Sequence, residues 1–207
     1  MPEKALIIVD MQYDFLPGGS LAVESGDTII GAINTMMKSF ELNIATQDWH
    51  PKNHVSFASS HPGLSQMDTI EHQGSEQVLW PDHCVQGTRG AMLHEDLDPR
   101  PITLVVRKGF RSNLDSYSAF FENDRTTPTG LEGYLNTLGV RDLYVCGLAT
   151  DYCVFFSAED AKRIGYNVHL VTDATRGVGF PEGSVERALA QLKKTGVHMI
   201  DSHEVTG

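Results

Sequence analysis

Short apolar runs alternate along this chain with segments whose apolar residues recur at helical spacing. The runs are continuous, as strands buried on both faces of a parallel sheet require. They predict six strands, within Ala5–Val9, Leu42–Thr46, Ile102–Val106, Leu143–Cys146, Val168–Val171 and Val197–Ile200. Helices are predicted from Asp27 or Thr28 through Met37, and at Leu131–Leu138, Cys153–Ile164 and Val185–Leu192. The last three helices would end at Gly139, Gly165 and Gly196.

Strands that alternate with helices form parallel sheets that are covered on both faces. The expected fold class is α/β, a three-layer α/β/α sandwich around a doubly wound, mainly parallel six-stranded sheet. A length of 207 residues fits one domain with a substantial core, and no repeat or linker divides the chain. We therefore expect residues 1–207 to form a single domain.

The regular periodicity fades between Asp48 and Pro101. Six of the nine histidines lie in this stretch, which we predict to be a loop region. A loop region of this length inside a compact domain is usually functional. Because several metal-ligating residue types gather here, the region at about 48–100 is the expected metal-binding part of the domain.

Composition and charge limit the kinds of binding partner that we expect. The net charge of -11 argues against nucleic acid, because phosphate binding needs clustered Lys and Arg. No apolar stretch approaches the length of a membrane span, and the first residues are not those of a secretory signal, so no membrane partner is expected. Three cysteines form no disulfide framework, which favours a cytoplasmic location. The sequence does not decide between a monomer and a homo-oligomer.

Reactive side chains follow four of the predicted strands. Asp10, Asp48 and Lys108 come at or just after three strand ends, and Cys153 follows a fourth strand at a predicted helix start. The carboxyl ends of parallel strands lie along one edge, where open α/β sheets bind ligands. The four side chains are therefore expected to share one crevice, as in a cysteine hydrolase with a metal beside the nucleophile.

Cys153 is the candidate nucleophile. A helix N-terminus and a nearby lysine both favour the thiolate, which predicts a thiol pKa below its usual value of about 8.5. The same junction offers free backbone N–H groups that can hold an oxyanion. Cys146, inside an apolar strand, is expected to be a buried structural residue. Cys84 either packs or, beside His83, acts as a ligand.

Asp48 and His50 are two residues apart and precede Pro51, which favours extended backbone. Both side chains then point to one side and can bind the same ion. His83 is the candidate third ligand. Such a set with open positions suits zinc, iron or manganese, so one divalent metal ion is expected as cofactor. His54 stays open, as a fourth ligand or as a residue that contacts the ligands.

Several motifs together carry a family resemblance. They lie in the segments Val9–Phe15, Asp48–Pro51, Trp80–Cys84, Lys108–Gly109 and Gly147–Val154. In this order they resemble the nicotinamidases (pyrazinamidases), a branch of the isochorismatase-like cysteine hydrolases. The Gly147–Val154 segment is specific to the cysteine hydrolases of this fold. The Asp-Trp-His and Trp-Pro-Asp-His-Cys segments distinguish nicotinamidases from relatives that lack the metal.

The resemblance implies hydrolysis of nicotinamide, and also of pyrazinamide, through a thioester on Cys153. It implies a catalytic triad of Asp10, Lys108 and Cys153, and an oxyanion hole made by the N–H groups of Ala149 and Cys153. It further implies a non-proline cis peptide at Leu148–Ala149. The implied metal ligands are Asp48, His50 and His83. The implied pyridine-pocket residues are Phe15, Leu21, Trp80, Tyr117, Ala149 and Tyr152.

Two other interpretations stay open at this point. An amidase of the same fold that acts on another amide, such as a carbamoyl amide, would keep the triad without needing the metal residues. A zinc-stabilised binding or redox-sensing protein would have a closed metal shell and a cysteine that reacts without turnover. Metal content, and the effect of replacing Cys153 on activity, separate these interpretations.

Overall fold

A parallel sheet forms the centre of the molecule, in a computed structural model that describes residues 2–206. Its strands are β1 (Lys4–Val9), β2 (Asn43–Asp48), β5 (Ile102–Lys108), β6 (Asp142–Leu148), β7 (Asn167–Arg176) and β8 (His198–Ile200). The order is β5-β2-β1-β6-β7-β8, and every neighbouring pair is parallel. The predicted six-stranded sheet is confirmed, with each strand close to its expected position.

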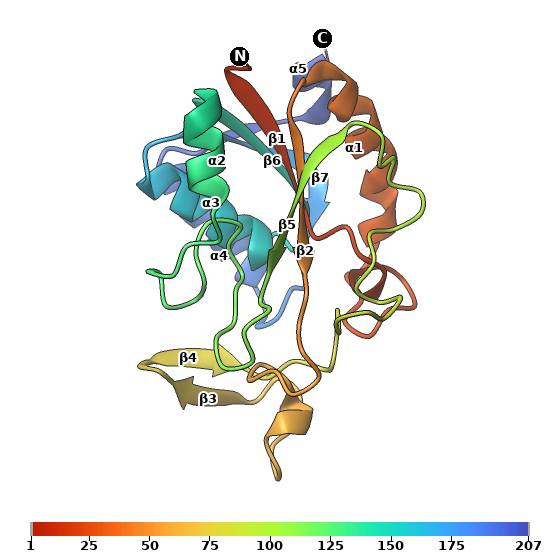
Figure 1. Cartoon of the computed structure of the whole chain (residues 1–207), viewed down its shortest axis with the longest axis vertical. Coiled ribbons are helices and arrows are strands. Elements are labelled where there is room, and N and C mark those ends of the chain that lie inside the picture. Colours follow the sequence, from red (N-terminus) through yellow and green to blue (C-terminus); the bar gives the residue numbers. More distant parts are fainter. Residues whose placement is uncertain (1, 207) are drawn as a thin grey trace.

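Helices cover both faces of the sheet (Figure 1). One face carries α1 (Ile30–Met36) and α5 (Ser202–Thr206); the other carries α2 (Leu131–Leu138), α3 (Cys153–Arg163) and α4 (Ser184–Lys194). The predicted α/β/α sandwich is therefore confirmed, although α5 was not predicted. None of the helices within residues 2–206 has the length and apolar character needed to cross a membrane.

The central strand β1 shows why its sequence is a continuous apolar run. Ile7 and Val9 pack in the core beneath α2 and α3, whereas Leu6 and Ile8 pack in the core beneath α1. All four side chains are fully buried. Because each face of the sheet has its own helical layer, a strand residue is buried whichever way it points.

A hairpin was missed in the region predicted as loop. It consists of β3 (Thr69–His72) and β4 (Ser75–Val78), and it lies beyond the carboxyl ends of the sheet strands (Figure 1). Gln73 and Gly74 form its turn with φ values of 50° and 80°, as a tight two-residue hairpin requires. Only Gln77 within 69–78 is buried, so no apolar alternation marked these strands in the sequence.

The strand order reverses beside β1. From β1 the chain continues outward to β2 and β5, and then returns to place β6, β7 and β8 on the other side. Ligands of open α/β sheets bind at the carboxyl ends of the strands where the order reverses. Asp10 directly follows β1, and residues 149–152 lead from β6 to Cys153. Both residues therefore lie at the reversal point.

The close pairing of β1 and β6 at this point predicts a strict need for glycine. Gly147 has φ +107°, and a Cβ there would lie 2.1 Å from the carbonyl oxygen of Val9, whereas Gly139 (φ +75°) has open space around it. We expect Gly139→Ala to lower the free energy of unfolding by about 1 kcal/mol and Gly147→Ala by at least about 2 kcal/mol more. Urea unfolding measures both values. Equal losses would contradict a steric requirement set by Val9.

Candidate active site and metal centre

Lys108, the last residue of β5, lies at the centre of a fully buried cluster of charged side chains. Its Nζ is 2.8 Å from Asp10 Oδ2 and 3.4 Å from Cys153 Sγ. It also forms an ion pair with Asp48 and donates a hydrogen bond to the carbonyl oxygen of Ser116 at 3.1 Å. One ammonium thus brings together the ends of β1, β2 and β5 and the start of α3.

Two carboxylates share the Lys108 charge. Burial disfavours the ammonium, but Asp10 and Asp48 outweigh this effect and raise the pKa of Lys108 well above its usual value. Burial also opposes ionisation of Asp48, yet Lys108 and His50 hold its pKa well below the usual range. The pKa of Asp10 is raised instead, because burial and the neighbouring Asp48 outweigh the attraction of Lys108. Asp10 is therefore the more basic carboxylate of the two.

Asp10 is held in place by Thr46. The Thr46 hydroxyl donates to Asp10 Oδ1 at 2.6 Å, and its oxygen lies 3.1 Å from the Asp10 backbone N–H. Asp10 Oδ2 is in ionic contact with Lys108 but has no partner with hydrogen-bond geometry among the described residues. Cys153 Sγ lies within 4.8 Å of an Asp10 carboxylate oxygen. This carboxylate can therefore accept the thiol proton.

Cys153 is the first residue of α3 and is 6% exposed. The N–H groups of the first helical turn have no partner inside the helix, so that of Cys153 can bind an oxyanion. The Leu148–Ala149 peptide just before it is cis, as the resemblance implied. Burial raises the pKa of the thiol well above its usual value despite Lys108. The expected lowered pKa is wrong, because it counted the lysine and the helix end but not the depth of the site.

Asp48, His50 and His83 each bring one ligand atom within 4.8 Å of the other two. The Nε2 atoms of His50 and His83 lie 3.5 Å and 3.9 Å from Asp48 Oδ2. The Nδ1 atom of each ring lies 2.8 Å from a backbone carbonyl oxygen, that of Gly109 for His50 and that of Pro81 for His83. A ring that donates from Nδ1 keeps its Nε2 lone pair for a metal. These buried donors fit a divalent cation.

The pKa values of the two histidines shift in opposite directions. Burial and the neighbouring His50 lower the pKa of His83 to about 4, so its ring is neutral near pH 7. The pKa of His50 is raised because Asp48 outweighs the effect of burial. A cation between these residues would take the place of the His50 proton, since a ligating imidazole is neutral.

Gly109 leaves the space that the His50 ring occupies. A Cβ on Gly109 would lie 2.4 Å from His50 Cε1, and the residue has φ +63°. The Lys108–Gly109 pair therefore supplies both the central ammonium and the carbonyl oxygen that orients the His50 ring.

His54 lies against His50 rather than among the three candidate ligands. Their ring centroids are 4.2 Å apart. His54 Nδ1 lies 2.7 Å from Ser56 Oγ, and Nε2 lies 3.4 Å from the carbonyl oxygen of Leu114. Burial lowers its pKa to about 4. Both ring nitrogens thus face protein partners, although His54 also forms a second buried group with His50 and Asp115.

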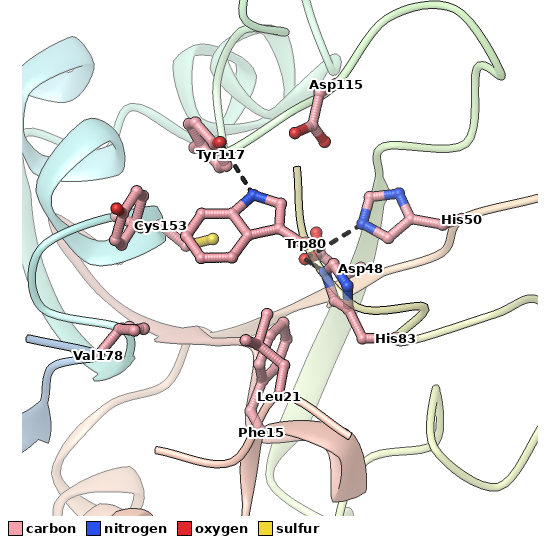
Figure 2. Close-up of a pocket in the computed structure, with 12 residues that line it drawn as sticks. Phe15, Leu21, Asp48, His50, Trp80, His83, Asp115, Tyr117, Cys153 and Val178 are labelled. Atoms are coloured by element: carbon pink, nitrogen blue, oxygen red, sulfur yellow. Dashed lines mark hydrogen bonds and ion pairs between the residues drawn. The ribbon is translucent and has the colours of Figure 1, made fainter. Parts of the chain in front are cut away.

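A cavity opens between Cys153 and the candidate metal ligands (Figure 2). All six residues expected in the pyridine pocket line it: Phe15, Leu21, Trp80, Tyr117, Ala149 and Tyr152. Trp80 Nε1 donates to the Tyr117 hydroxyl at 3.1 Å, and the rings of Trp80 and Tyr152 pack edge-on at 4.8 Å. Aromatic side chains from three separate segments therefore form one wall.

Three residues of this site were not predicted from the sequence. Asp115 and Val178 line the cavity. The Gln12 side chain pairs with the backbone of Asp48, as a neighbouring strand would, through two hydrogen bonds of 2.8 Å. Asp115 could have been noticed as an acid shortly after Lys108. Val178 carries no motif, and only the tertiary structure reveals its place.

Comparison with known proteins supplies the family. The family model of the isochorismatase domain matches residues 4–204. The chain belongs to the isochorismatase family. The chain is 48% identical to the nicotinamidase of Acinetobacter baylyi, over 97% of its own length and 94% of that protein.

Two solved structures agree with that placement. A nicotinamidase/pyrazinamidase of Acinetobacter baumanii superimposes with a TM-score of 0.96 at 47% identity, covering 98% of both chains. A pyrazinamidase of Pyrococcus horikoshii in complex with zinc superimposes with a TM-score of 0.76 at 37% identity, covering 97% of this chain and 99% of that one. The isochorismatase-like fold is thus shared by relatives of the nicotinamidase branch.

The loop that carries Asp115 and Tyr117 contains a buried carboxylate, Glu122. It pairs with Arg111, and its Oε2 has no hydrogen-bond partner among residues 2–206. Burial, partly opposed by Arg111, raises its pKa from 4.5 to about 7. The unfolded chain therefore releases this proton first, and stability present below pH 4.5 is lost as the pH rises to about 7.

This raised pKa predicts how a neutral substitution at Glu122 changes stability with pH. We expect Glu122→Gln to gain about 2–3 kcal/mol relative to the parent protein between about pH 4.5 and pH 8. Urea unfolding at both pH values gives the difference. A pH-independent difference would show that Glu122 ionises normally in the folded protein.

Proposed function

We propose that this protein is a nicotinamide amidohydrolase, which converts nicotinamide and water to nicotinic acid and ammonia, and that it also hydrolyses pyrazinamide. The observation that carries the proposal is one buried cluster that joins Cys153, Lys108 and Asp10 to three candidate metal ligands beside an aromatic cavity. The names of the Acinetobacter relatives, nicotinamidase and pyrazinamidase, supply the substrate class.

The first half of the reaction forms a thioester. Because the Cys153 thiol is protonated at rest, a base must take its proton during attack, and Asp10 is placed to do so. The thiolate attacks the carboxamide carbon, and the N–H groups of Ala149 and Cys153 hold the oxyanion. Protonated Asp10 then gives its proton to the leaving ammonia. Lys108 stabilises the ionised partners throughout.

The second half regenerates the thiol. A water molecule takes the place of ammonia, and Asp10 removes its proton as it attacks the thioester carbon. The bond from carbon to Cys153 Sγ breaks, nicotinic acid is released, and the sulfur recovers the proton from Asp10. The net change is one amide bond hydrolysed by one water molecule.

Asp48, His50 and His83 would hold one divalent metal ion, which we propose to be zinc, iron or manganese. When bound, such an ion would supply a coordination site for the pyridine ring nitrogen, which would orient the substrate. The zinc in the Pyrococcus horikoshii pyrazinamidase supports this choice of metals. Phe15, Leu21, Trp80, Tyr117 and Tyr152 would pack on the pyridine ring and exclude water.

We further infer that residues 1–207 act as one hydrolase domain in the cytoplasm. The free state of all three cysteines supports this location, because thiols stay reduced there. The net charge of -11 supports a small-molecule substrate rather than nucleic acid.

The proposed chemistry requires the thiol of Cys153. We expect Cys153→Ala to lower the rate of ammonia release from nicotinamide by at least about 1,000-fold. Substrate binding by the remaining residues cannot make up for the loss of a nucleophile that acts together with its base. The matched control is Cys146→Ala, which removes a buried thiol from β6 outside the site and should keep the parent rate. Turnover by the Cys153 variant at the parent rate would exclude the thioester route.

The proposed ligand set predicts unequal roles for two neighbouring histidines. We expect His83→Ala to weaken zinc binding by more than about 100-fold and His54→Ala by no more than about tenfold, because only the former removes a direct ligand. Competition with a zinc-binding dye measures both affinities without any turnover. Equal losses would make His54 a fourth ligand.

A further inference from the structure

The loop between β7 and α4, residues 177–183, forms part of the cavity wall through Val178. None of the loop residues is buried. A segment that buries so little apolar surface gains little from the hydrophobic effect, and it opens easily unless polar contacts hold it. Val178 packs against the edge of the core beneath α1, and hydrogen bonds to the rest of the protein fix the backbone that carries it.

Those hydrogen bonds converge on one carboxylate. Asp151 Oδ1 accepts the backbone N–H of Val178 at 2.9 Å. Asp151 Oδ2 accepts the N–H of Gly179 at 2.9 Å and the hydroxyl of Ser184 at 2.5 Å. Hydrogen bonds to an ionised acceptor are about twice as strong as neutral ones. Asp151 thus ties the start of the loop to the first residue of α4.

The chain order couples this anchor to the reacting group. Asp151, Tyr152 and Cys153 are consecutive, and the Tyr152 hydroxyl donates to the carbonyl oxygen of Phe180 at 2.6 Å. Within residues 2–206, the hydrogen bonds of the Asp151 side chain all come from Val178, Gly179 and Ser184. Its carboxylate therefore acts on the shape of the cavity rather than on the proton transfers of the triad.

We propose that Asp151 is a positioning residue for substrate specificity, which holds Val178 against the cavity and so limits the ring substituents that fit. Val178 lies on the opposite side of the cavity from His50 (Figure 2). The proposal rests on the proposed function, in which the carboxamide meets Cys153 and the ring nitrogen points toward Asp48, His50 and His83. A methyl group on ring carbon 4, beside the carboxamide, then meets this wall, whereas one on carbon 6, beside the nitrogen, does not.

The test compares Asp151→Asn with the parent protein on nicotinamide, 4-methylnicotinamide and 6-methylnicotinamide. The Asn side chain offers one acceptor oxygen instead of two, so part of the loop is released. We expect KM for nicotinamide to rise about tenfold while kcat changes less than about threefold. The kcat/KM ratio of 4-methylnicotinamide to nicotinamide should rise about tenfold, and the ratio for 6-methylnicotinamide should stay within about twofold.

Two further variants test whether the effect comes from Val178 and whether it is specific to Asp151. Val178→Ala trims the wall and leaves the Asp151 contacts in place, so it should raise the same 4-methyl ratio. Asp173→Asn is the matched control, because Asp173 holds the N–H (2.7 Å) and hydroxyl (2.6 Å) of Ser202 at the start of α5, outside the cavity. It should change neither KM nor the ratios. Trypsin should cut after Arg176, next to the loop, faster in Asp151→Asn than in Asp173→Asn.

The outcomes separate this proposal from the proposed function. A parent protein that does not hydrolyse nicotinamide would overturn the proposed function, and with it the specificity role. Alternatively, the parent protein is active and Asp151→Asn lowers kcat equally for all three amides at unchanged KM. This result would mean that Asp151 acts on Cys153 rather than on the cavity wall, and it would overturn this inference alone. If Asp151→Asn does not fold, Ser184→Ala removes one of the three hydrogen bonds. Unchanged 4-methyl ratios in Ser184→Ala and Val178→Ala would then reject the proposal.

Discussion

A buried ammonium shared by two carboxylates is the interaction on which the rest of this structure depends. Asp48 and Lys108 are direct register partners on β2 and β5, and Asp10 follows the neighbouring strand β1. Removing the Lys108 charge would leave two buried carboxylates without compensation, which proteins tolerate poorly. The register of three strands is thus tied to one ion cluster, and the cysteine thiol lies against that same cluster.

The cluster gives two aspartates opposite properties. Asp48 directs one oxygen to Lys108 and the other to the two histidines, so it stays ionised and connects Lys108 to the candidate metal ligands. Asp10 pairs with Lys108 and accepts a hydrogen bond from Thr46, and burial leaves it the more basic group. Identical side chains acquire different roles because burial and neighbouring charge shift their pKa values apart. Burial raises the pKa of the neighbouring Cys153 thiol as well.

Around this buried cluster, much of the cavity wall comes from segments that lie outside the sheet. Gln77 of the hairpin supports Asp115, Trp80 follows the hairpin, and Val178 comes from the loop anchored by Asp151. A site built from loops on a fixed scaffold can change its substrate range without disturbing the chemistry. The charged cluster and these wall residues differ in where their side chains are attached: the cluster lies at strand ends, and the wall residues lie on loops.

The sequence by itself determined the strands of the central sheet and the reactive side chains at their ends. Periodicity located all six strands and the helix Leu131–Leu138 with its terminal Gly139, and chain order placed Asp10, Asp48 and Lys108 on one sheet edge. Tertiary structure alone decided the polar hairpin, the direction of the Cys153 pKa, and the parts of Gln12 and Val178 in the site. Periodicity and caps depend on near neighbours, which a sequence displays. Desolvation and cavity walls depend on residues far apart along the chain, which meet only after folding.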